Sequence, residues 1–167
     1  MKKKLLSLIA SLMLVLSVSG LNVFADEKNI EEPVIIGEFD GNLSDYMDSD
    51  DPMSKVVSNV RINSYATYDK SKGIQVYAKL YVPALSFPKP QFTSMIGTTS
   101  VILNGKTTSK AFSKYASGTS TIEVNVNTGV TGNSGNKGTV TVSGVATSLN
   151  ALDGGGNFGI SYPVTLP

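Results

Sequence analysis

Residues 60–82 read VRINSYATYDKSKGIQVYAKLYV, and this stretch decides the fold class. Apolar or small residues alternate with polar and aromatic residues on both sides of the loop Asp69–Gly73. This alternation around a short loop of turn-forming residues predicts a β-hairpin. When positions whose numbers sum to 142 are paired, the apolar residues of both strands fall on one face. A slip by one residue would expose them, so we expect this register.

The other face of this hairpin is the candidate binding surface. Its register places Arg61 opposite Tyr81 and Tyr65 opposite Tyr77, with Lys79 between them. Cations and phenols on an open sheet face are suited to stacking on sugars and to contacting anionic polymers or lipid head groups. The candidate binding residues are therefore Arg61, Tyr65, Tyr77, Lys79 and Tyr81. In the competing interpretation, tyrosines that favour strands anyway are covered by a second sheet.

Further strands are predicted along the rest of the chain. Asn104-Gly105 is typical of a type I′ hairpin turn between extended segments. Alternating valines before and after the loop Thr128–Gly138 predict two more strands, and a last strand covers Phe158–Leu166. Pro163 places that last strand at an edge. Whether Val34–Phe39 adds a strand stays open. We expect an all-β fold, an antiparallel, immunoglobulin-like β-sandwich of about seven or eight strands. A closed barrel is the alternative.

The first 25 residues have the features of a secretory signal peptide. Three lysines, Lys2 to Lys4, precede the apolar run Leu5–Val18, and Val23-Phe24-Ala25 places small residues at a cleavage site after Ala25. The alternative is an uncleaved anchor, but the run of 14 residues is shorter than the roughly 20 that span a bilayer. We expect a secreted, extracellular protein without a stable transmembrane anchor, either released or retained non-covalently at the cell surface.

Charge is distributed unevenly along the chain. Residues 26–53 carry one basic and ten acidic groups, whereas residues 54–167 carry ten basic and three acidic groups. Like charge at this density opposes compaction, so we expect 26–53 to be a mostly disordered acidic leader and 54–167 to be the sandwich domain. Two alternatives remain for the leader. It could be a pro-segment that masks the basic half. It could also bind calcium through Asp48-Ser49-Asp50, although the turn glycine and distal glutamate of a calcium loop are missing.

The composition excludes several kinds of catalytic site. The chain has no His and no Cys, so it cannot form a Ser-His-Asp triad, a thiolate nucleophile or a His/Cys zinc site. Ser86-Phe87-Pro88-Lys89 matches Ser-x-x-Lys, but Pro88 disfavours the helix that this motif needs. The carboxylates after residue 53 are Asp69, Glu123 and Asp153, and two of them lie in predicted turns. We expect no catalytic residues, no metal and no cofactor, and therefore not an enzyme.

Two functional hypotheses follow. The first is a secreted, non-enzymatic protein that binds or decorates the cell envelope or extracellular matrix through its basic, tyrosine-bearing sheet face. Its expected partners are an anionic envelope polymer, a polysaccharide or lipid head groups, and not nucleic acid. The second is an antimicrobial or membrane-active effector held latent by the acidic segment. It rests on the opposite charges of that segment and the basic half, and on the nearly uncharged, Thr-rich stretch Thr121–Val145. The composition of this stretch resembles the membrane-crossing hairpins of secreted β-pore formers.

Overall fold

The structure is a computed structural model, and it describes residues 32–46, 60–83, 90–149 and 155–167. The predicted signal peptide, the Ser86–Lys89 motif, the Asp48–Asp50 carboxylates and Asp153 lie outside these residues. The unit Pro33–Pro167 contains all the described strands. In the described part of the chain, no helix is long and apolar enough to cross a membrane.

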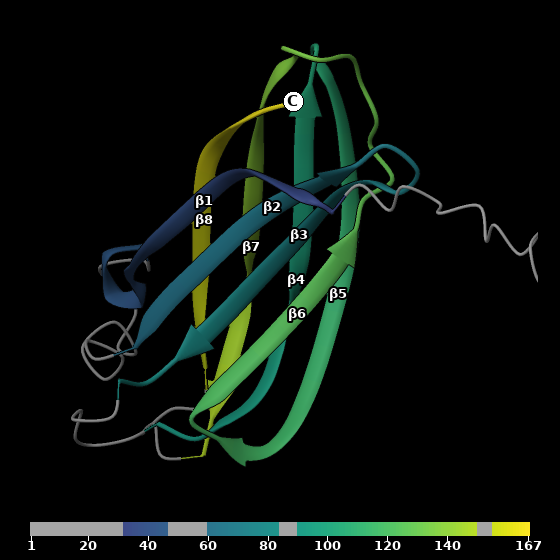
Figure 1. Ribbon diagram of the computed structural model, residues 1–167. Coiled ribbons are helices and arrows are strands. Elements are labelled where there is room, and N and C mark those ends of the chain that lie inside the picture. Colours follow the sequence, from purple (N-terminus) through teal and green to yellow (C-terminus); the bar gives the residue numbers. More distant parts are fainter. Residues whose placement is uncertain (1–31, 47–59, 84–89, 150–154) are drawn as a thin grey trace, which may run out of the picture. The chain divides into compact units, whose positions relative to one another are not determined.

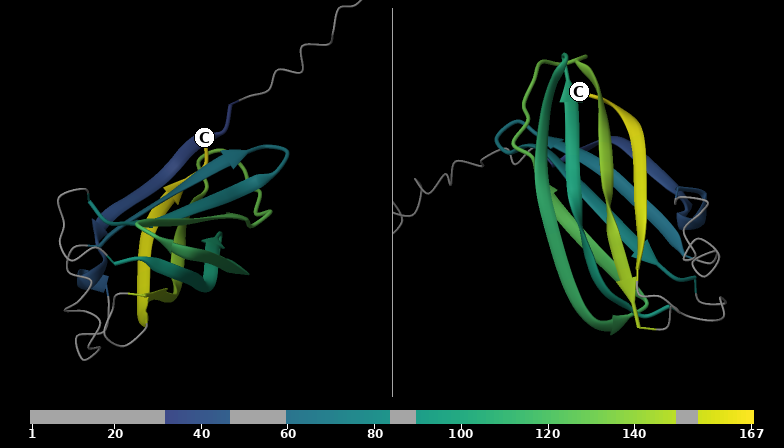
Figure 2. Two further views of the ribbon diagram at one scale, coloured as in Figure 1. Left: turned by 90° about the horizontal axis from the view of Figure 1, so that it is seen from below. Right: turned by 180° about the vertical axis from the view of Figure 1, so that it is seen from behind.

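Within the described residues, eight antiparallel strands form two four-stranded sheets (Figure 1). Sheet A has the order β1-β2-β3-β6, with β1 Val34–Asn42, β2 Arg61–Asp69, β3 Gly73–Tyr81 and β6 Thr121–Asn127. Sheet B has the order β5-β4-β7-β8, with β4 Phe92–Leu103, β5 Lys106–Thr119, β7 Lys137–Ser148 and β8 Gly155–Thr165. A short 3-10 helix, η1 Leu43–Tyr46, follows β1. The predicted all-β sandwich is confirmed, and its two layers are seen in Figure 2. Its strand order differs from the ABED and CFG sheets of immunoglobulin domains.

The first hairpin has the predicted register. Arg61 pairs with Tyr81, Tyr65 with Tyr77, and Asp69 with Gly73. The loop is held by the Asp69 carboxylate, whose Oδ1 accepts hydrogen bonds from the Ser71 hydroxyl at 2.5 Å and from the backbone N–H of Ser71 at 2.7 Å. These bonds favour the ionised form and lower the pKa of Asp69. The turn therefore has its own local stabilisation, which helps to set the register of the strands.

The second predicted hairpin is also present. β4 pairs with β5 from Leu103 and Lys106 outward, and the two turn residues have positive φ angles of 51° at Asn104 and 74° at Gly105. A type I′ turn requires positive φ at both central positions, which Asn and Gly tolerate best. The residue types at Asn104-Gly105 therefore explain the tight turn between β4 and β5.

The segment after β5 does not form the hairpin that its composition suggested. β6 pairs with β3 in sheet A, whereas β7 pairs with β4 and β8 in sheet B. The connecting loop begins against sheet A, where the N–H and hydroxyl of Thr128 donate to the carbonyl of Ile74, and it reaches sheet B, where Gly135 N–H donates to the carbonyl of Leu166. The resemblance of Thr121–Val145 to a membrane-crossing hairpin therefore does not extend to its strand pairing.

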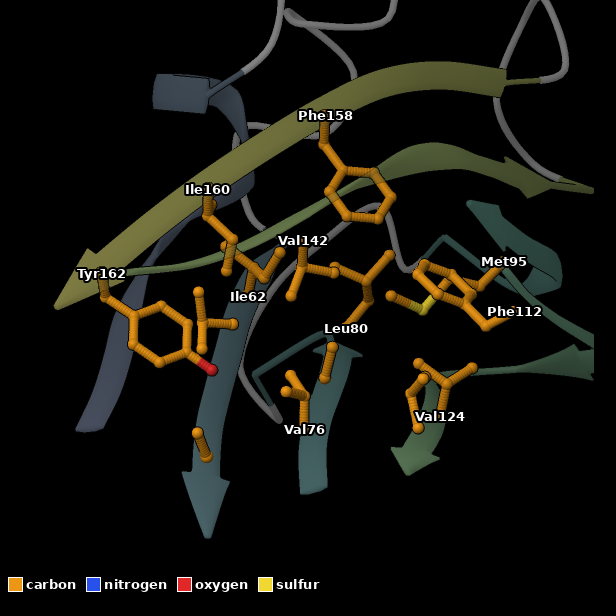
Figure 3. Close-up of a cluster of buried hydrophobic side chains, with 14 of the residues drawn as sticks. Ile62, Val76, Leu80, Met95, Phe112, Val124, Val142, Phe158, Ile160 and Tyr162 are labelled. Carbon is orange, nitrogen blue, oxygen red and sulfur yellow. The ribbon is translucent and has the colours of Figure 1, made fainter. Parts of the chain in front are cut away.

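The inner faces of the two sheets form the core. Ile62, Val76 and Leu80 of sheet A face Val142 and Ile160 of sheet B (Figure 3), and all are almost fully buried. Burial of such side chains, at about 25 cal/mol per Å² of apolar surface, is the main stabilising term in a chain without disulfides. The core determines which faces of the sheets point outward.

A polar contact between Tyr162 and Ser64 crosses this core. The hydroxyl of Tyr162 lies 3.0 Å from Ser64 Oγ, and Ser64 in turn donates to the carbonyl of Tyr77 at 2.8 Å. Burial raises the pKa of Tyr162 to about 12, and the hydrogen bond with Ser64 opposes that shift. The contact joins β8 to the middle of the first hairpin.

The two lateral sides of the sandwich differ. On one side β1 lies against β8, and a Cβ at Gly37 would clash with the carbonyl oxygen of Pro163. Glycine is needed there because only its backbone allows this approach. On the other side the edge strands β5 and β6 are neighbours but do not pair. The first side is closed, and the second borders two hollows described below.

β1 lies inside the segment 26–53 that we expected to be a disordered leader. Ile36 and Phe39 pack against the core, and Glu38 and Asp40 alternate with them on the outer side. The free edge of β2 offers backbone hydrogen-bond partners to this short alternating stretch. The stabilisation from this pairing exceeds the repulsion between the acidic side chains of the stretch. The sandwich therefore begins at Val34 and not at residue 54. Residues 26–31 and 47–53 lie outside the described part of the chain.

Candidate binding face

All five predicted binding residues lie on the outer face of sheet A. The registers of β1, β2, β3 and β6 arrange the outward side chains in rows across the sheet. Three rows carry the candidates and their neighbours: Asn42-Arg61-Tyr81-Thr121, Asp40-Asn63-Lys79-Glu123 and Glu38-Tyr65-Tyr77-Asn125. The second sheet packs on the opposite side, so the tyrosines are not core residues.

Tyr65 and Tyr77 form a stacked pair at the centre of this face. Their ring centroids are 4.7 Å apart and their planes are within 12° of parallel. Stacking therefore covers one face of each ring. Because β6 follows β3 in the sheet, the other face of Tyr77 is turned toward Asn125. The aromatic surface open to a ligand on that side is a single ring face.

A hollow of about 570 Å³ lies next to this pair, and we call it the tyrosine slot. Both tyrosines line it, and Lys114 reaches it from β5 in the other sheet. The remaining polar lining comes from Asn63, Lys79, Glu123 and Asn125. The slot therefore offers a ligand an aromatic surface together with amide, ammonium and carboxylate groups.

Arg61 and Tyr81 lie at the other end of the face. Arg61 Nη2 is 3.0 Å from Asp40 Oδ1, and this hydrogen bond, with the charge of Asp40, raises the pKa of Arg61. Lys79 Nζ lies 5.7 Å from the centroid of the Tyr81 ring, within the range of a cation–π contact. Arg61 is thus already engaged by a carboxylate, whereas Lys79 lines the tyrosine slot.

The charge of this face differs from the expectation of a basic surface. Glu38 and Asp40 come from β1, and Glu123 stands opposite Lys79 on β6. The prediction considered only the two strands of the hairpin and did not identify which strands flank them. The alternation of acids in 34–42 and the lone acid within 121–127 were the available signals. Lys114 and Asn125 were also missed as slot residues, because neither belongs to the hairpin.

A second hollow, the edge groove, separates β5 from β6 and measures about 470 Å³. Five consecutive residues of each strand line it, 110–114 of β5 and 123–127 of β6. Consecutive residues point alternately to opposite sides of a strand, so strand edges must border this groove. The two hollows share Lys114, Glu123, Val124 and Asn125.

The outer face of sheet B has a different chemistry. One row, Ser109-Ser100-Thr141-Ser161, crosses all four strands. Its hydroxyls are paired, with Ser100 Oγ 2.7 Å from Ser109 Oγ and Thr141 Oγ1 2.9 Å from Ser161 Oγ. Tyr115 lies at one end of this face and is 71 % exposed. This face provides matched control positions for experiments on the tyrosine slot.

No known protein family, curated protein or solved structure matches this chain. Within the described residues, no group of three or more His, Cys, Asp or Glu side chains could hold a metal ion.

Proposed function

We propose that this protein is a secreted, non-enzymatic module that binds a polysaccharide of the cell envelope or extracellular matrix in the tyrosine slot. The observation that carries the proposal is that Tyr77, which stacks on Tyr65, lines the slot together with Asn125 and Lys79. A sugar ring has apolar C–H faces and polar hydroxyl edges, so one aromatic face with hydrogen-bonding groups around it matches both parts.

The charged groups of the slot narrow the class of ligand. Lys79 and Lys114 supply two ammonium groups, and Glu123 supplies one carboxylate. This balance favours a polysaccharide that carries acidic groups, since one lysine is left without an opposing slot carboxylate. Binding should therefore weaken as salt rises, although stacking on Tyr77 persists.

The pore-forming form of the membrane-active alternative loses its compositional support. It depended on Thr121–Val145 as a hairpin, and β6 pairs with β3 instead of β7. The masking role of the acidic segment is weakened for residues 34–42, because they form a strand of sheet A. We therefore do not propose a latent pore former.

The test is retention of the purified protein on isolated envelope polysaccharide, measured by depletion from solution. Tyr77→Ala is expected to weaken retention by about tenfold, as expected for a lost aromatic contact. Tyr115→Ala removes an exposed tyrosine from the opposite face and should leave retention unchanged. Equal retention of the wild type and the Tyr77→Ala variant would contradict the proposal.

A further inference from the structure

Three of the four edge strands that the described residues form carry features that block strand addition. β1 has a bulge between Ile35 and Gly37 and lies against β8. β8 contains Pro163. β5 points Lys110 and Lys114 toward the inner side, on the same side as the buried Phe112. Bulges, prolines, cover by another element and inward charges are the usual means of protecting a sheet edge.

β6 has no bulge, no proline and no inward charge, and the edge groove separates it from its neighbour β5. Its seven residues, TIEVNVN, pair with β3 in an unbroken register from Thr121 to Asn127. Its inward residues Ile122, Val124 and Val126 are buried, and its sequence contains no proline or glycine. A regular, unbulged edge of this kind is a template for another strand.

The hydrogen bonds at both ends of β6 show which backbone groups face its free edge. Val82 N–H donates to the carbonyl of Ser120, and Thr128 N–H donates to the carbonyl of Ile74. In an antiparallel ladder the bonded positions alternate, so the even-numbered residues of β6 bond to β3. The N–H and C=O groups of Glu123 and Asn125 therefore point to the free edge, along the edge groove.

The charges beside this edge favour one kind of occupant. Lys110 and Lys114 line the groove from β5, and Glu123 is the carboxylate that lines it from β6. A strand added to β6 would direct alternate side chains toward these lysines. A second copy of β6 would direct Ile122, Val124 and Val126 there and would bring its own lysines to the junction. Like charges would then accumulate, which disfavours that pairing.

We propose that the edge groove binds an extended, acidic polypeptide segment of another protein as a fifth strand of sheet A. Main-chain hydrogen bonds to Glu123 and Asn125 supply the strand pairing, and Lys110 and Lys114 select acidic side chains at alternate positions. This inference goes beyond polysaccharide binding and does not depend on it.

The first experiment measures the affinity of the full secreted protein for a short synthetic peptide that alternates glutamate with threonine. The matched peptide has lysine in place of glutamate. We expect the acidic peptide to bind at least about tenfold more tightly than the basic one. Lys110→Glu should reverse this preference, whereas Lys106→Glu, which alters the same strand outside the groove, should not. Equal binding of the two peptides would overturn the proposal.

The second experiment separates strand addition from simple charge attraction. Hydrogen exchange read by NMR should show that the acidic peptide protects the amides of Glu123 and Asn125, with no comparable change on β1 or β8. Binding without protection of these two amides would overturn strand addition. Sedimentation that shows a stable dimer, with the same amides protected in the absence of peptide, would show that a second copy occupies the edge and would also overturn the proposal.

The two functional proposals can fail independently. Lys110 lines the edge groove and does not line the tyrosine slot. Lys110→Glu should therefore alter peptide binding and leave polysaccharide retention unchanged. Tyr77→Ala should weaken polysaccharide retention and leave peptide binding unchanged.

Discussion

The rings of Tyr65 and Tyr77 are parallel neighbours, and this stack makes the two tyrosines unequal although they face each other across β2 and β3. Tyr77 has its free face on the β6 side, where Lys79, Asn125 and Glu123 line the tyrosine slot. Tyr65 also lines the slot, and its ring packs on the other face of Tyr77. In our account Tyr77 contacts the sugar, and Tyr65 is a positioning residue.

This inequality predicts a graded effect of substitutions. Tyr65→Ala should weaken polysaccharide retention less than Tyr77→Ala, because it frees the Tyr77 ring without removing it. Tyr65→Phe should restore retention, since the aromatic ring and not the hydroxyl makes the stack. Depletion isotherms on the same polysaccharide measure all three variants. A larger loss from Tyr65→Ala than from Tyr77→Ala would show that the sugar contacts Tyr65 instead.

The lysines of the slot predict a salt dependence. Lys114→Gln removes an ammonium group that reaches the slot from sheet B. Affinity for an acidic polysaccharide should fall, and the remaining affinity should depend less on salt, because the screened attraction is smaller. Lys137→Gln, at the start of β7 and outside both hollows, is the control. Identical salt curves for the wild type and the Lys114→Gln variant would exclude Lys114 from the contact.

Tyr162 predicts an alkaline limit to stability. Its pKa is raised from 10.0 to about 12 in the folded protein by burial. The folded state therefore holds its proton more tightly than the unfolded state. This contribution to stability is fully present below pH 10 and is lost as pH rises through about 12, amounting to about 2 to 3 kcal/mol for a two-unit shift.

Tyr162→Phe isolates that effect. Ser64 keeps a partner in the variant because it also donates to the carbonyl of Tyr77. The fall in the free energy of unfolding between pH 10 and 12 should be smaller in the variant than in the wild type, as measured by urea denaturation. Parallel pH profiles for the two proteins would contradict the assignment.

Phe112 predicts a stability effect at the β5 edge. Its ring lies over Gly97 of β4, where an added Cβ would come within 2.8 Å of Phe112 Cζ. An aromatic ring over a strand glycine covers backbone that has no side chain of its own. Phe112→Ala should lower the free energy of unfolding by about 3 kcal/mol, the low end for a buried phenylalanine, because β5 is an edge strand. Ala111→Ser, on the exposed side of β5, should change it little.

The position of β1 predicts the outcome of truncation. A chain that begins at Ser54 lacks β1 and leaves the β2 edge, including Arg61, without its partner Asp40. It should unfold at a lower temperature and aggregate more readily than a chain that begins at Glu32, because an unprotected edge is exposed. Thermal unfolding followed by circular dichroism compares the two. Equal transition temperatures would show that β1 is dispensable and would reopen the pro-segment hypothesis.

The parts of the fold that could be predicted are those in which the alternation of side chains and the turn residues specify the same strand pairing. In 60–82 the alternation of both faces and the loop residues specify one register, and Asn104-Gly105 specifies its own turn. The pairing of β6 with β3 could not be derived in this way, because a nine-residue loop allows β6 and β7 to lie in one sheet or in two. The pairing partner of an edge strand is distant in the sequence, so no local pattern identifies it.

The part of the candidate site that lies on the first hairpin could be predicted, and the part contributed by other strands could not. Tyr65, Tyr77 and Lys79 share a face because the hairpin register requires it. Glu123 and Lys114 join the slot only through strand order and through the packing of the two sheets. That is why the sequence predicted a basic face, whereas the face is of mixed charge.

The most direct measurement of the central claim is an NMR titration of the isotope-labelled secreted protein with soluble oligosaccharides from the envelope polysaccharide. Our account predicts that the shifted resonances cluster at Tyr77, Lys79, Asn125 and Lys114. It also predicts that Tyr77→Ala raises by about tenfold the oligosaccharide concentration needed to shift those that remain. Shifts confined to the outer face of sheet B, around Ser100 and Thr141, would contradict it.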